Sequence, residues 1–266
     1  AGWVDEIPDG LVRALQEGHC VAVVGAGLSI PAGLPGFEAL LKQVASASSV
    51  SLALPDRGGY DELDRVQSCL ADLVGREKMC SLMLELLRSP QPLPAKAEAV
   101  ISAFVQVPFS SVVSWNWDEL LDHSFVLVPH NAQGFERVLT SDASPRAGNS
   151  PPETPLVKMQ GNLRDPQSVV LTQADYRRRD LEALTFLQCL YSSRVVLYVG
   201  LSLRTTGVER YFPGPGGSHY AILNDVSEEQ KADLLRNFGI QVISYDSVAT
   251  DFQGNALVLE ELARRV

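Results

Sequence analysis

The chain has 266 residues, 45% of them hydrophobic, and a formal net charge of −10. That length suits one α/β domain, or one domain with an inserted helical module. The acidic balance and the absence of a long basic tract argue against binding to a nucleic-acid backbone. No apolar run approaches the length of a membrane span, so no membrane association is expected.

Cysteine usage gives a second exclusion. The four cysteines, Cys20, Cys69, Cys80 and Cys189, form no C-x-x-C pair, which argues against a zinc ribbon. We therefore expect reduced thiols in a cytoplasmic protein that carries no metal.

Hydrophobic periodicity and turn residues predict alternating helices and strands. In chain order, the sequence predicts helix 4–17, strand 20–24, helix 36–47, loop 49–59, helices within 60–88, helix 95–106, strand 111–114, loop 141–155, strand 155–158, strand 168–171, helix 180–192, strand 194–199, strand 219–223, strand 240–244 and helix 252–265. Strands that alternate with helices predict a doubly wound parallel sheet, with residues 1–266 as a single domain. The helix-only block at 48–108 reads as an insertion within it.

The most informative segment is a strand that runs into a glycine loop. Val21 to Val24 are followed by Gly25-Ala26-Gly27-Leu28-Ser29, and glycines there allow close approach to a ligand whose phosphates face free amide groups. Ile30 replaces the third glycine of the dinucleotide fingerprint, and no Lys follows to make a P-loop. A tight turn without a ligand stays an alternative at this point.

Three further segments follow predicted strands, where parallel sheets place ligands. They are S-W-N-W-D-E-L-L at 114–121, K-M-Q-G-N at 158–162 and Y-V-G-L-S-L at 198–203. Together with G-A-G-L-S and A-G-L-P-G-F at 25–37, these segments resemble, in the same order, the NAD-binding elements of Sir2-like (sirtuin-fold) proteins. Because it lacks a zinc module, the chain resembles the divergent, zinc-free branch of NAD hydrolases found in bacterial anti-phage effectors.

The resemblance implies a Sir2-like Rossmann variant and a role for each matched residue. Asn116 would position water or a ribose, and Asp118 would contact nicotinamide. The residues that would hold the dinucleotide are Gly25, Ala26, Gly27, Ser29, Phe37, Gly200 and Ser202, with Asn224 near the adenosine. The residues alone leave other readings open: Ser29 and Asn116 could close turns, Asp118 could cap a helix that begins near Glu119, and Phe37 could be core.

Gln160 departs from the pattern, because the family places a histidine there as general base. A carboxamide cannot take a proton at any useful pH. Gln160 therefore predicts that the chain binds the nucleotide but turns it over poorly. It also predicts that Gln160→His increases NAD cleavage by at least about 10²-fold. Neither His19, His123, His130 nor His219 is placed to substitute as the base, and the run 177–179 (Arg-Arg-Arg) reads as a solvated helix end.

The expected activity is hydrolysis of NAD to nicotinamide and ADP-ribose, impaired at Gln160. The alternative is a non-catalytic module that senses NAD or ADP-ribose or drives assembly, and a protein deacylase is a weaker third reading. NAD or ADP-ribose is the expected partner. The resemblance also implies a homo-oligomer, or a partner protein that triggers activity.

Overall fold

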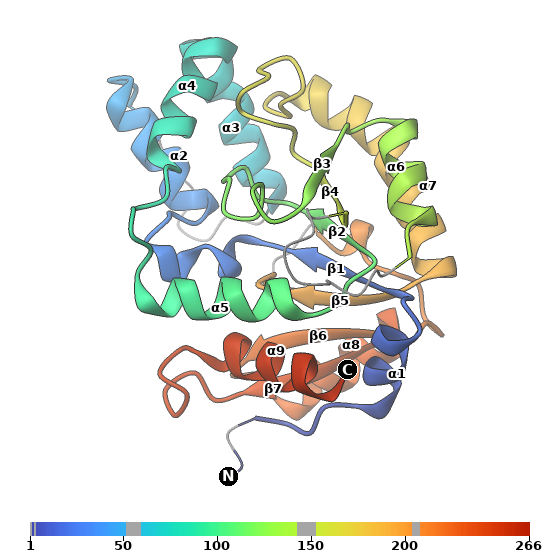
Figure 1. The fold of residues 1–266 in the computed structure, drawn as a ribbon. Helices are drawn as coiled ribbons and strands as arrows, with labels where there is room; N and C mark the ends of the chain where they lie inside the picture. Colours follow the sequence, from blue (N-terminus) through green and yellow to red (C-terminus); the bar gives the residue numbers. More distant parts are fainter. Residues whose placement is uncertain (1, 3, 52–59, 143–152, 204–207) are drawn as a thin grey trace.

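The computed structural model describes residues 2, 4–51, 60–142, 153–203 and 208–266. Within them lies a seven-stranded sheet in the order β3-β4-β2-β1-β5-β6-β7, in which every pairing is parallel (Figure 1). The strands are β1 (Cys20–Val24), β2 (Ser111–Ser114), β3 (Val126–Val128), β4 (Pro155–Lys158), β5 (Val195–Val199), β6 (His219–Asn224) and β7 (Ile240–Tyr245). The predicted doubly wound α/β fold is confirmed.

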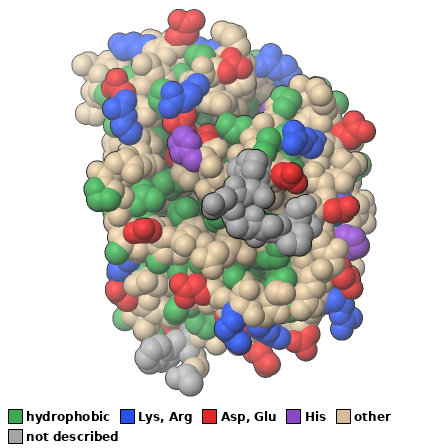
Figure 2. Space-filling model, in the orientation of Figure 1, with side chains coloured by type: hydrophobic (Ala, Val, Ile, Leu, Met, Phe, Trp, Pro, Cys, Tyr) green, Lys and Arg blue, Asp and Glu red, His purple; other side chains and the backbone are tan. Residues whose placement is uncertain are grey.

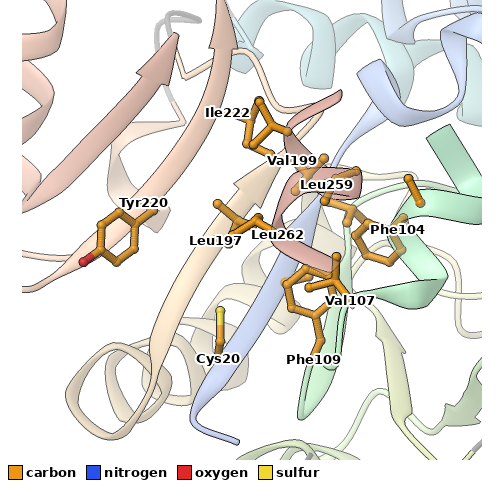
Figure 3. Close-up of a cluster of buried hydrophobic side chains, with 14 of the residues drawn as sticks. Cys20, Phe104, Val107, Phe109, Leu197, Val199, Tyr220, Ile222, Leu259 and Leu262 are labelled. Carbon is orange, nitrogen blue, oxygen red and sulfur yellow. The ribbon is translucent and has the colours of Figure 1, made fainter. Parts of the chain in front are cut away.

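Helices cover both faces of the sheet because its central strands are apolar on both sides. On β1, Ala22 and Val24 belong to a core with α1 (Asp9–Gln16), α5 (Ala95–Gln106) and α9 (Gly254–Arg265). Val21 and Val23 belong to a second core with α6 (Ala132–Thr140), α7 (Gln173–Ser193) and α8 (Glu228–Phe238). Figure 3 shows the first core, where Phe104 of α5 and Leu262 of α9 lie around Leu197 of β5. This continuous apolar burial explains the uninterrupted hydrophobic runs of β1 and β5.

A smaller helical unit lies beside the sheet. The helices α2 (Phe37–Ala47), α3 (Tyr60–Val74) and α4 (Arg76–Leu86) share their own core, which Leu171 also joins (Figure 1). The helix α5 instead packs on α9 over the main sheet. The limits 48–108 for an insertion therefore stay a prediction, and we propose that α2 belongs with α3 and α4.

Several expected elements differ from the structure. Residues 168–171 form no strand; a turn ends at Ser168, and the Val170 amide donates to the Gln160 carbonyl. The helix α7 begins at Gln173 rather than 180, because Thr172 and Asp175 form a capping box. The sequence also left β3, α6 and α8 unassigned, and most of the predicted loops 49–59 and 141–155 lies outside the described residues.

The described surface and helices add two observations. On the face in Figure 2, the Lys and Arg side chains that are described lie interspersed with Asp and Glu rather than gathered in one basic patch. No described helix is both long and apolar enough to cross a membrane.

Candidate functional site

A pocket of about 580 Å³ opens where the parallel strands end, a volume typical of small-molecule sites. It lies at the carboxyl ends of β1, β2, β4 and β5, beside the point where the chain winds in opposite directions from β1. All predicted site residues except Ser29 line it: Gly25, Ala26, Gly27, Phe37, Asn116, Asp118, Gln160, Gly200, Ser202 and Asn224. The sequence motifs thus converge on one cavity, while the role of each residue stays a prediction.

The floor of the pocket is the contact between two glycine turns. The Gly27 amide donates to the Gly200 carbonyl at 2.7 Å, and the Gly25 amide donates to the Val199 carbonyl at 3.1 Å. A Cβ on Gly27 would lie 2.8 Å from the Gly200 Cα, and Gly200 has a φ of +69°. Glycine is required at both positions, because the two backbones touch and one is left-handed.

Ser29 lies just beneath this surface and links the two predicted polar residues. Its buried hydroxyl donates to Asp118 Oδ2 at 2.7 Å and accepts from Asn116 Nδ2 at 3.1 Å. The same Asn116 Nδ2 donates to the Gly25 carbonyl at 3.0 Å. Both hydrogens of the Asn116 amide are therefore engaged, which leaves Oδ1 as its acceptor. Asp118 Oδ1 accepts from the Leu120 amide at 3.1 Å, so Asp118 caps a turn, and the helix expected near Glu119 does not form.

Lys158, the last residue of β4, holds the segment that carries these groups. Its buried Nζ donates to the Asp118 carbonyl at 2.8 Å and to the Trp117 carbonyl at 3.2 Å. It also pairs with Asp122 at 3.2 Å. Burial raises the pKa of the Asp122 carboxyl even though Lys158 acts to lower it. This lysine therefore orients the loop after β2 without reaching the pocket itself.

Gln160 is 2% exposed and is held on two sides. Trp117 Nε1 donates to its backbone carbonyl at 3.1 Å, and Arg179 Nη1 donates to its side-chain Oε1 at 2.8 Å. Trp117 in turn packs against Phe37, with ring centroids 5.6 Å apart. The position that the resemblance assigns to a base is therefore a rigidly placed carboxamide.

Arg179 is the residue that sequence reasoning missed. It is 3% exposed, whereas its neighbours Arg177 and Arg178 are exposed, so the prediction of a solvated run is wrong for Arg179. Its guanidinium lies over the rings of Trp115, Tyr176 and Tyr211, at 5.3, 4.9 and 5.3 Å from the centroids. The signal was present in the sequence, because Arg179 lies three residues after buried Tyr176 and four before buried Ala183 on α7.

A buried carboxyl on α3 borders the same cationic cluster. Burial raises the pKa of Asp64 to about 7, although a hydrogen bond from Tyr176 and the charges of Arg179 and Arg210 act to lower it. Its Oδ1 has no hydrogen-bond partner among the described residues. Asp64 is therefore a group whose charge changes near neutral pH at the junction of α3 and α7.

The remaining polar residues lie toward the far end of the pocket. Asn224 is the last residue of β6, and its Nδ2 donates to Asp225 Oδ2 at 2.9 Å. Asp225 holds the loop after β7 by accepting from the Ser247 amide at 2.9 Å. Asn224 is thus braced by its neighbour at the strand end where the adenosine was expected.

The histidines and cysteines lie elsewhere. None of the four histidines, all of which are described, lines the pocket. Burial lowers the pKa of His130 and of His219 to about 4, which is typical of neutral core histidines. Among the described residues, no group of three or more His, Cys, Asp or Glu side chains is placed to hold a metal ion.

With this geometry established, the class of protein follows. The family model for the SIR2-like domain matches residues 110–243, half of the chain, and the chain belongs to that family. It is 21% identical to the NAD(+) hydrolase ThsA of Acinetobacter baumannii over 97% of this chain and 55% of that protein. It is 22% identical to the NAD(+) hydrolase ThsA of Cytobacillus dafuensis over 91% of this chain and 48% of that protein. The chain therefore spans about half the length of these relatives.

Among solved structures, the chain matches a Sir2 homologue mutant in complex with ADP-ribose. That structure has a TM-score of 0.49 and 15% identity, and the match covers 97% of this chain and 96% of the other. A Sir2 homologue in complex with NAD has a TM-score of 0.44 and 16% identity, with 98% and 94% covered.

Proposed function

We propose that the pocket binds NAD⁺, with the nicotinamide ribose at Asn116, Asp118 and Gln160, and the adenosine half along Gly200, Ser202 and Asn224. The observation that carries this proposal is the convergence of the glycine turns with the Asn116–Ser29–Asp118 hydrogen-bond chain in one cavity. The Gly25 and Gly27 amides already donate to the carbonyls of Val199 and Gly200, so the glycine loop would serve the phosphates by letting them approach the backbone closely. The names of the ThsA relatives agree with this ligand.

The reaction that suits these groups is hydrolysis of the bond between nicotinamide and ribose. Water would add to the ribose C1′ as the C1′–N bond breaks, nicotinamide would leave with the bonding electron pair, and the proton that the water loses would pass to solvent. Asn116 Oδ1 would accept a hydrogen bond from the water or a ribose hydroxyl, because both amide hydrogens are already engaged. The fixed Asp118 carboxylate would stabilise the positive charge that develops on the ribose.

Turnover would be slow because the pocket lacks a proton acceptor at position 160. A positioned general base contributes about 10²–10⁴-fold, and the Gln160 carboxamide cannot supply it. The chain would therefore bind NAD⁺ and cleave it only slowly. A homo-oligomer, or a sensor or partner protein, would supply the trigger for any activity.

A second function is a module that senses NAD or ADP-ribose or drives assembly. The buried Arg179 favours it, since Gln160 is built into a hydrogen-bonded network and is not a bare replacement for histidine. A sensor would bind the nucleotide equally well and gain no cleavage from restored base chemistry. A protein deacylase is favoured by no observation in this site.

The test pairs calorimetry with a nicotinamide-release assay. We expect NAD⁺ and ADP-ribose to bind with heat, and nicotinamide release to stay near the uncatalysed background. Asn116→Ala should weaken binding, while Asn237→Ala, an exposed position on α8 that does not line the pocket, should not. No binding of either nucleotide would overturn the ligand assignment, and rapid release by the unmodified chain would overturn the slow turnover.

A further inference from the structure

We propose that Arg179 is a positioning residue that makes position 160 a hydrogen-bond donor toward the pocket, even when a histidine replaces Gln160. This inference rests on the proposed function, because it concerns the same pocket. It begins from one contact, the 2.8 Å hydrogen bond from Arg179 Nη1 to Gln160 Oε1. A guanidinium has donors only, so this contact fixes which end of the carboxamide is the oxygen.

The carboxamide oxygen is turned away from the pocket. Gln160 lines the pocket and Arg179 does not, so Oε1 points into the protein toward the buried guanidinium. The other end of the carboxamide is Nε2, which can only donate. A group that only donates cannot remove a proton from a ribose hydroxyl.

Arg179 cannot turn aside or lose its charge. Its Nη2 donates to the Tyr211 hydroxyl at 2.5 Å and to Asp180 Oδ1 at 2.7 Å. The three aromatic rings of Trp115, Tyr176 and Tyr211 surround it, and an arginine side chain stays protonated in proteins. The donor that faces position 160 is therefore permanent.

An imidazole placed at position 160 would meet the same donor. A neutral imidazole has one N–H and one lone pair, and Arg179 would occupy the lone pair. The second nitrogen must then carry the hydrogen and would present it toward the pocket. A second proton would place two cations side by side in a buried site, which is unfavourable. Gln160→His alone would therefore fail to create a base, contrary to the expectation from the sequence.

The experiment compares Gln160→His, Arg179→Met and the double variant with the unmodified chain. Arg177→Met, an exposed arginine on the same helix, is the matched control. The first readout is ¹⁵N NMR of the histidine side chains, where the introduced imidazole is the signal that the parent lacks. In Gln160→His we expect one neutral tautomer from about pH 5 to pH 8. In the double variant, and not with Arg177→Met, we expect titration or the opposite tautomer.

The second readout is nicotinamide release. We expect Gln160→His to stay at background and the double variant to exceed it by at least about 10²-fold, with a rate that rises with pH as the imidazole loses its proton. The same imidazole behaviour with and without Arg179, or full cleavage by Gln160→His alone, would overturn the inference. If Arg179→Met does not fold, Arg179→Leu, which also carries no donor, makes the same comparison.

The two proposals fail in different ways. The tautomer is read without nucleotide, so it tests Arg179 even if NAD⁺ does not bind. A locked tautomer together with no heat of NAD⁺ binding would retain the role of Arg179 and refute the ligand. Heat of NAD⁺ binding without a locked tautomer would retain the ligand and refute the role of Arg179.

Discussion

Gly200→Ala should loosen the contact between the two glycine turns and with it the floor of the pocket. A Cβ at this position would lie 2.4 Å from the Leu28 amide nitrogen and 2.9 Å from the Gly27 carbonyl carbon. Both are backbone atoms of the first glycine loop, so no side-chain rotation relieves the overlap. The turns must move apart, which breaks or lengthens the 2.7 Å hydrogen bond from Gly27 to Gly200.

The magnitude follows from two separate costs. A left-handed conformation costs an L-residue roughly 1–2 kcal/mol. Overpacking in a tightly packed region costs a further 1–3 kcal/mol, roughly. We therefore expect Gly200→Ala to lower the free energy of unfolding by about 2–5 kcal/mol. NAD⁺ affinity should fall by at least about tenfold, the equivalent of roughly 1.4 kcal/mol.

The control is Gly33→Ala, because Gly33 has a similar φ of +79° but no atom within 4 Å of its added Cβ. Gly33→Ala should lower the free energy of unfolding only by the conformational cost, and it should keep the affinity for NAD⁺. Urea unfolding followed by circular dichroism measures stability, and calorimetry measures binding. Equal losses in the two variants would refute the reasoning, since only Gly200 has the backbone contact.

Three more predictions concern buried polar groups. Asn116→Ala should lower the free energy of unfolding by about 1–3 kcal/mol, because the Gly25 carbonyl loses its partner, as urea unfolding will show. Lys158→Met should cost about 3–5 kcal/mol by leaving Asp122 buried without its cation, and adding Asp122→Asn should recover much of that loss. For Asp64, a pKa raised to about 7 means that the folded state binds more protons between about pH 4 and pH 7, so its contribution to stability falls as pH rises through that window. Asp64→Asn should remove that fall in unfolding curves measured across the window.

Each of these has an outcome that contradicts it. An Asn116→Ala protein as stable as its parent would mean that water replaces the amide without cost. A double variant at Lys158 and Asp122 no better than Lys158→Met would show that the contacts of Lys158 to backbone carbonyls dominate. The neutral histidines lose stability in the opposite direction, on acidification, so only the difference between the parent and Asp64→Asn isolates the carboxyl. A difference in stability between the parent and Asp64→Asn that does not change with pH would refute the prediction for Asp64.

The convergence of the pocket residues could be predicted from the sequence because parallel strands end at one edge of a sheet. The residues after β1, β2, β4 and β5 were recognised as turns or polar groups, and the order of the motifs agreed with the fold. The network beneath the pocket could not be predicted. That the Ser29 hydroxyl donates to Asp118 Oδ2 depends on the depth of a side chain, which a motif does not encode.

Arg179 was missed because the start of its helix was placed too late. A helix beginning at 180 leaves the run 177–179 at the helix end, where three arginines read as solvated. The capping box at Thr172 and Asp175 moves the start back to Gln173. From that start, Tyr176, Arg179 and Ala183 fall on one buried face at helical spacing. A single misplaced boundary thus concealed the residue that holds Gln160.

Gln160 and Arg179 should then behave as one unit in folding as well as in chemistry. Burying a guanidinium is unfavourable unless its donors are satisfied, and Gln160 satisfies one of them. Gln160→Ala should therefore destabilise the chain more when Arg179 is present than in an Arg179→Met background. A double-mutant cycle by urea unfolding should give a coupling of about 0.5–3 kcal/mol, as residues in one hydrogen-bond network do. Additive losses would show that the carboxamide merely lies beside the guanidinium, and a histidine could then occupy position 160 as a base without any change at Arg179.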